Sequence, residues 1–90
     1  MTTVRILISG FVQGVGFRHF IKSNAQSLNL TGWVKNIPGG NVEANIQGDE
    51  KNIESLIALC KKGPFLSEVE NIEVEKNNDS ERFDKFEILK

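Results

Sequence analysis

The first half of the chain alternates between strand-like and helix-like spacing of its hydrophobic residues. Residues 4–11 are rich in β-branched side chains and alternate imperfectly, which predicts a strand with one well-buried face. From Phe17 the apolar side chains recur every three to four residues as far as Leu28, so we expect an amphipathic helix that ends near Asn29. Residues 31–37 then predict a second strand.

The second half begins with a turn and repeats the alternation of element types. Residues 38–41, Pro-Gly-Gly-Asn, supply the dihedral angles of a tight hairpin, and residues 42–46 alternate as a third strand. Asp49 occupies an N-cap position and Gly63-Pro64 is a helix stop. The second helix predicted between them has an apolar stripe formed by Ile53, Leu56, Ile57 and Cys60.

The remaining residues complete the order of elements. Val69, Ile72 and Val74 predict a fourth strand, residues 77–80 a loop, and Phe83, Phe86 and Ile88 a last short strand. This order is typical of the α+β ferredoxin-like split-βαβ sandwich (β-α-β-β-α-β), with an antiparallel sheet, two helices on one face and a short extra C-terminal strand. We expect residues 1–90 to form a single domain. The fold hosts many functions, so it specifies none.

Charge is distributed unevenly although the net charge is only −1. Residues 1–42 contain four basic residues and no acid, whereas residues 43–90 contain all twelve acids and seven bases. The basic half is where an anion is expected to bind. The asymmetry alone is equally consistent with acids that simply accumulate on solvated faces of the second half.

Composition excludes several classes of protein. No apolar run approaches the roughly 20 residues that cross a bilayer, and the N-terminus has no basic region followed by an apolar stretch, so neither a membrane span nor a secretory signal is expected. The lone cysteine, Cys60, excludes an internal disulfide and suits a reducing compartment. We therefore expect a cytoplasmic protein.

Metal and acid–base chemistry lack the residues they need. With His19 and Cys60 as the only histidine and cysteine, on different predicted helices, no ordinary zinc site is available, and we expect neither a metal nor another cofactor. His19 follows Arg18, whose permanent positive charge disfavours protonation of a general base. The carboxylates show no recognisable pairing, and Cys60 on an apolar stripe is interpreted as a buried hydrophobic residue.

What remains is a candidate anion site between the first strand and the first helix. Gly14 and Gly16 precede a helix whose first turn holds Arg18, so backbone N–H groups and a guanidinium would converge on one point, as in phosphate binding. The loop matches neither the dinucleotide fingerprint nor a Walker loop. Taken alone, glycines that merely permit a turn and a solvated arginine are an equally good interpretation. Asn36, just before the Pro-Gly-Gly turn, is by itself best explained as a turn former, and Trp33 as a core aromatic residue.

Two segments taken together resemble a known family. Residues 10–18, Gly-Phe-Val-Gln-Gly-Val-Gly-Phe-Arg, and residues 32–36, Gly-Trp-Val-Lys-Asn, closely resemble the two signature motifs of acylphosphatases. Gly63-Pro64 followed by Val69 and Ile72 is also similar to the family, so the resemblance spans essentially the whole chain.

The resemblance implies metal-independent hydrolysis of acyl phosphates, such as acetyl phosphate, carbamoyl phosphate or 1,3-bisphosphoglycerate, to a carboxylate and inorganic phosphate. It assigns Arg18 to phosphate binding and Asn36 to orienting the attacking water, while the substrate's own phosphate accepts the proton. It also implies that phosphate is cradled by the backbone N–H groups of Gln13, Gly14, Val15, Gly16 and Phe17. Electrostatics and positioning suffice for such a reaction, because the carboxylate is a good leaving group.

This chain departs from the family pattern at two places. Lys35 stands where arginine is frequent, and the turn at residues 39–41 replaces an Asp-Gly-Ser or Asp-Gly-Thr type. If a hydroxyl at that turn holds the asparagine in other members, Asn41 would have to do so through its amide, and activity would be lower.

Three other interpretations remain open from the sequence. A degenerate binding module would hold phosphate without turnover. An RNA-binding sheet is disfavoured, because the basic residue preceding Gly10-Phe11 and a basic surface are both missing. The same motifs open larger multidomain proteins of hydrogenase maturation, but no second domain is expected here. We therefore expect a monomer that binds a small acyl phosphate or inorganic phosphate, with no nucleic-acid or membrane partner.

Overall fold

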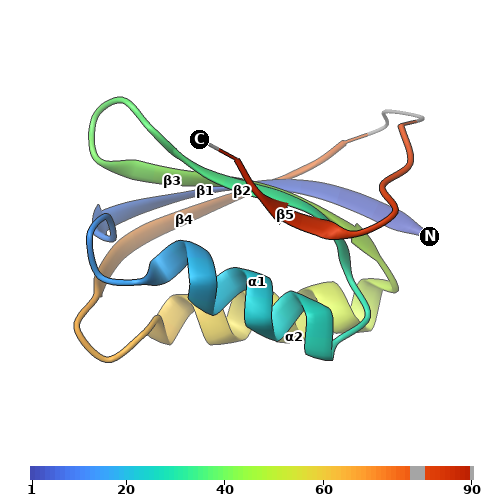
Figure 1. Cartoon of the computed structure of the whole chain (residues 1–90), viewed down its shortest axis with the longest axis horizontal. Helices are drawn as coiled ribbons and strands as arrows, with labels where there is room; N and C mark the ends of the chain where they lie inside the picture. The colour runs from blue at the N-terminus through green and yellow to red at the C-terminus, as the bar shows by residue number, and fades with distance from the viewer. Residues whose placement is uncertain (78–80, 90) are drawn as a thin grey trace.

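The computed structural model describes residues 1–77 and 81–89. Two helices pack on one face of a five-stranded sheet (Figure 1). The elements follow the chain as β1 (Thr2–Phe11), α1 (Phe17–Ser27), β2 (Thr31–Ile37), β3 (Asn41–Gly48), α2 (Glu50–Lys62), β4 (Glu68–Lys76) and β5 (Phe86–Ile88). The predicted order of elements is therefore confirmed. Of the loop predicted at residues 77–80, residues 78–80 lie outside the described part.

The sheet has the strand order β4-β1-β3-β2-β5. Strands β1 to β4 pair antiparallel, as predicted. The extra strand differs, because β5 runs parallel to β2 and makes the sheet mixed. Phe83 is not part of this strand but precedes it, and its backbone N–H donates to Oε1 of Gln47 at 3.1 Å. Gln47 also donates through Nε2 to Thr3 Oγ1 and to the carbonyl of Glu81, which holds this segment against the sheet.

The core lies between the helices and the sheet. The predicted helical stripes point into it, with Phe17, Ile21 and Ala25 buried on α1 and Ile53, Leu56 and Cys60 buried on α2. The inward positions of the three central strands complete the core with Val4, Ile6, Ile8, Val34, Val42, Ala44 and Ile46.

Both ends of α2 are set by the residues that the sequence indicated. Asp49 is the N-cap, and its carboxylate accepts a hydrogen bond from the backbone N–H of Lys51 at 2.9 Å. Gly63 is the C-cap, and its N–H donates to the carbonyl of Leu59. Neither α1 nor α2 has the length and apolar composition that crossing a membrane requires.

Cys60 is fully buried, as its position on the apolar stripe indicated. Burial raises the pKa of its thiol from 9.0 to about 12, because the thiolate would lose its hydration. The group is therefore a protonated hydrophobic side chain at neutral pH rather than a nucleophile.

Trp33 corrects the expectation of a core aromatic residue. Strand alternation places it on the face opposite Val34, away from the helices, and its side chain is only half-buried. The ammonium of Lys35 lies 5.1 Å from the centroid of the ring. Trp33 thus belongs to the outer, helix-free face of the sheet.

Candidate active site

Several connections meet at one end of the sheet. Since β1 is antiparallel to β3 and β4, the end of β1 lies beside the beginnings of those two strands. The loop into α1, the β2–β3 hairpin and the turn from α2 into β4 consequently lie at the same end of the molecule (Figure 1). The predicted anion site, residues 13–18, is at this end, and we call it the anion loop.

The side chain of Gln13 fastens the anion loop to the hairpin. Its Nε2 donates to the carbonyl oxygen of Ile37 at 3.0 Å and to that of Asn41 at 2.9 Å. Ile37 and Asn41 are the last paired residues of the hairpin. The contact brings the anion loop beside the end of β2, where Asn36 lies. Sequence reasoning gave Gln13 only a backbone role and missed this side-chain contact.

Gly14 and Gly16 meet a conformational requirement. Their φ angles are +77° and +80°, in the left-handed region that side chains disfavour. A Cβ at either position would meet no protein atom within 4 Å. The space next to both glycines is therefore open, and a ligand can approach the backbone there.

The N-terminus of α1 has no side-chain cap. Its N-cap is Gly16, and its first turn contains no acidic residue. By contrast, α2 begins with the carboxylates of Asp49 and Glu50. The start of α1 therefore has no carboxylate of its own to offset the positive end of the helix dipole, which favours an anion there, whereas two carboxylates offset it in α2.

Arg18 lies in this first turn and is half-buried. Within residues 1–77 and 81–89, its guanidinium makes no side-chain hydrogen bond or ion pair. Arg5, on the outer face of the sheet, is instead paired with the carboxylates of Glu43 and Glu75. Unlike Arg5, Arg18 therefore lies at the anion loop with the hydrogen-bond donors of its planar guanidinium free to bind a ligand.

The structure divides the basic half of the chain between two faces. Arg5 and Lys35 point to the outer face and both pair with Glu43, the latter at 3.8 Å. Arg18 and Lys22 lie on α1 and have no ion pair within the part of the chain that the structure describes. The charge asymmetry along the sequence thus overstates the positive charge at the site.

Asn36 lies near the end of β2 with a half-buried side chain. Its backbone is in register with Val42, and alternation places its side chain on the helix side of the sheet, as for Val34. Over the described ranges, the amide of Asn36 makes no side-chain hydrogen bond, neither to the turn nor to Asn41. Gln13 fastens the turn instead, so the amide of Asn36 is free to bind a ligand or water.

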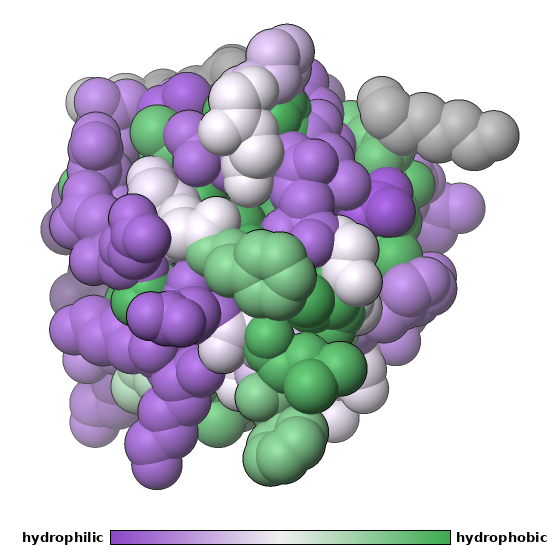
Figure 2. All heavy atoms as spheres, turned by 90° about the vertical axis from the view of Figure 1, so that its left-hand side faces the viewer, coloured by the Kyte–Doolittle hydropathy of each residue, from purple (hydrophilic) through white to green (hydrophobic). Residues whose placement is uncertain are grey.

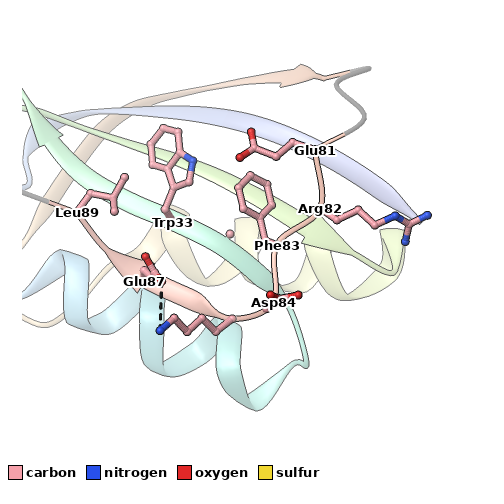
Figure 3. Close-up of a pocket in the computed structure, with 9 residues that line it drawn as sticks. Trp33, Glu81, Arg82, Phe83, Asp84, Glu87 and Leu89 are labelled. Carbon is pink, nitrogen blue, oxygen red and sulfur yellow. Dashed lines mark ion pairs between the residues drawn. The ribbon is translucent and has the colours of Figure 1, made fainter.

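A groove of about 390 Å³ lies away from the anion loop. It is on the outer face, and Figure 3 shows Trp33, Phe83 and Leu89 along it, with charged side chains at its rim. No residue of the anion loop lines it. In the described part of the chain, no three His, Cys, Asp or Glu residues are grouped so that they could hold a metal ion.

The family model and the relatives and structures that are more than 30% identical identify one family. The family model described as Acylphosphatase matches residues 4–88. An acylphosphatase of Acaryochloris marina is 44% identical over 87 residues, which are 97% of this chain and 92% of that protein. The crystal structure of acylphosphatase from Bacillus subtilis superposes with a TM-score of 0.96 at 38% identity and full coverage of both chains. Full-length HypF, in a phosphate- and nucleotide-bound form, matches 99% of this chain with a TM-score of 0.91 at 38% identity, over 12% of its own length.

Replacing Gln13 tests whether its side chain positions the anion loop. We expect Gln13→Ala to lower the free energy of unfolding by about 1–2 kcal/mol, because two hydrogen bonds are lost, and to weaken phosphate binding, because the loop is released. Denaturant unfolding and a phosphate titration measure the two effects.

Gln47 provides the matched control at the opposite end of the sheet, where its amide also bridges two segments. We expect Gln47→Ala, which loses three hydrogen bonds, to lower stability at least as much and to leave phosphate affinity unchanged. Equal phosphate affinity in the wild type and Gln13→Ala would contradict the positioning role.

Proposed function

This chain belongs to the acylphosphatase family and is a hydrolase that acts on acyl phosphates, and from that premise we propose how its residues carry out the reaction. The anion loop holds the phosphoryl group, Arg18 neutralises it, and Asn36 orients the attacking water. The observation that carries the proposal is the uncommitted guanidinium of Arg18 at the uncapped N-terminus of α1.

Phosphate binding follows from the backbone of the anion loop. In this mechanism the N–H groups of residues 13–17 bind the phosphoryl oxygens in the open space beside Gly14 and Gly16, where the dipole of α1 favours negative charge. The guanidinium of Arg18 binds two phosphoryl oxygens with two parallel hydrogen bonds. Together these groups stabilise the charge that develops on the phosphoryl oxygens in the transition state.

Hydrolysis requires a water molecule in line with the bond that breaks. The amide of Asn36, brought beside the loop by the Gln13 contact, binds that water and points its oxygen at phosphorus. The new P–O bond forms as the bond between phosphorus and the acyl oxygen breaks. The carboxylate leaves with the electron pair, and a phosphoryl oxygen takes the water proton. The reaction therefore does not require a residue that acts as a general base.

We also propose that residues 1–90 act as a single domain and a cytoplasmic monomer, with no cofactor and no nucleic-acid partner. The outer face of the sheet supports the last point. A sheet that binds RNA presents stacking aromatic residues and free positive charge, whereas the bases Arg5 and Lys35 of this face are paired with carboxylates. Glu73 and Glu87 add further negative charge to the face.

Metal independence is the first test of the mechanism. We expect the protein to release phosphate from acetyl phosphate at the same rate with and without EDTA, because backbone N–H groups and Arg18 replace the role of a cation. Phosphate release followed over time is the measurement. Loss of activity on chelation, reversed by a divalent ion, would contradict the mechanism.

Arg18→Lys tests the bidentate contact while keeping the positive charge. We expect kcat/KM for acetyl phosphate to fall by about 10²-fold or more and competitive inhibition by inorganic phosphate to weaken, because an ammonium lacks the planar fork. Arg82→Lys is the control at an exposed arginine outside the loop, and it should change neither value. A folded Arg18→Lys protein with wild-type kcat/KM would show that Arg18 is only a surface charge.

Asn36→Ala separates the positioning of water from the binding of phosphate. We expect kcat to fall by on the order of 10²-fold, while the inhibition constant of inorganic phosphate stays within about twofold of wild type. Asn71→Ala, on β4, is the control for losing an exposed strand asparagine. An unchanged kcat together with lower stability would assign Asn36 to the hairpin alone.

A further inference from the structure

Apolar side chains gather around the anion loop, where the proposed mechanism gives them no role. Phe11 is 61% exposed, Phe65 98% and Leu66 68%. All three lie at the end of the molecule that carries the loop, and Figure 2 shows hydrophobic surface gathered on this end. We call these residues, together with the half-buried Val15 of the loop itself, the apolar rim.

The exposed rim residues come from two segments of the chain, the end of β1 and the turn between α2 and β4. Phe11 is the last residue of β1, two positions before Gln13, and is in register with Glu68 at the start of β4. Phe65 and Leu66 lie in the preceding turn, which closes through hydrogen bonds from the backbone N–H and hydroxyl of Ser67 to the carbonyl of Pro64, at 2.9 and 2.7 Å.

This turn also packs on the beginning of α1. A Cβ on Gly63 would lie 2.9 Å from Cε2 of Phe17. The ring of Phe17, a residue of the anion loop, is buried. The turn and the anion loop therefore share a packing contact, which fixes the turn relative to the loop.

Exposure of these side chains is not explained by folding. A phenylalanine that is 98% exposed buries almost no surface, and neither the turn hydrogen bonds nor the Phe17 contact uses the side chains of Phe65 or Leu66. Clustered exposed apolar residues mark a binding surface. The acyl group of the substrate is covalently attached to the phosphate held in the loop, so it lies at the same end of the molecule as this surface.

We propose that the apolar rim binds the acyl group and selects acyl phosphates with aromatic or extended aliphatic acyl groups over acetyl and carbamoyl phosphate. The inference rests on the proposed function. Contact with the rim removes apolar surface of both partners from water, and this gain is much smaller for an acyl group that carries only a methyl or amino substituent. The selection is therefore made beside the phosphate site, without a closed pocket.

The test compares two substrates in two rim variants. Benzoyl phosphate probes the rim, and acetyl phosphate reports on the phosphate site. We expect the wild type to have the higher kcat/KM for benzoyl phosphate. In Phe11→Ser and in the double variant Phe65→Ser/Leu66→Ser, kcat/KM for benzoyl phosphate should fall about 5- to 10-fold, and that for acetyl phosphate less than about twofold.

Val74→Ser is the matched control, because Val74 is 48% exposed but lies near the other end of β4. This variant should leave kcat/KM unchanged for both benzoyl phosphate and acetyl phosphate. Equal losses for the two substrates in the rim variants, or no loss for benzoyl phosphate, would overturn the proposal. So would a wild-type dimer in sedimentation that the rim variants dissociate without a change in substrate ratio, since the rim would then bind a second copy.

Failure of the proposed function gives a different result. If neither substrate is hydrolysed by the folded wild-type protein, the enzyme mechanism is wrong, whatever the variants do. If acetyl phosphate is hydrolysed and the substrate ratio does not depend on the rim, only the specificity inference is wrong.

Discussion

The side-chain amide of Gln13 joins the anion loop to the β2–β3 hairpin, and the arrangement of the whole site depends on that contact. The loop belongs to the connection between β1 and α1, whereas Asn36 lies on β2, separated from β1 in the sheet by β3. Two hydrogen bonds from one side chain fix the distance between these parts. They occupy the turn carbonyls and leave the amide of Asn36 uncommitted.

The site keeps its hydrogen-bond donors free by separating them from acids. Arg18 lies at a helix end with no carboxylate in the first turn. Glu43 pairs instead with Arg5 and Lys35, on the opposite face of the sheet. An anion that enters the loop therefore need not displace an internal ion pair. Such donors are already oriented before the substrate arrives, which is what makes electrostatic stabilisation effective.

Features that depend on nearby residues could be predicted from the sequence, and those that depend on distant pairing could not. The helices, the Asp49 cap and the anion loop are set by spacings of a few residues. The Gln13 contact spans 24 and 28 residues, and nothing local to Gln13 indicates it. The parallel pairing of β5 with β2 likewise depends on where the chain that follows β4 rejoins the sheet. The large aromatic side chain of Trp33 favours a core position, whereas alternation with Val34 indicates the outer face that the structure shows. The roles of Arg18 and Asn36 come from the family motif and stay predictions.

The edge strand β4 bears on how the molecule behaves at high concentration. Its free edge is open to pairing with another strand, the usual route to edge-to-edge aggregation. Glutamates at positions 68, 70, 73 and 75 are all exposed along it. A second copy that approached this edge would bring its own row of carboxylates into close register with the first. The resulting repulsion opposes edge-to-edge pairing along the whole of β4, from the end that carries the anion loop to the opposite end of the sheet.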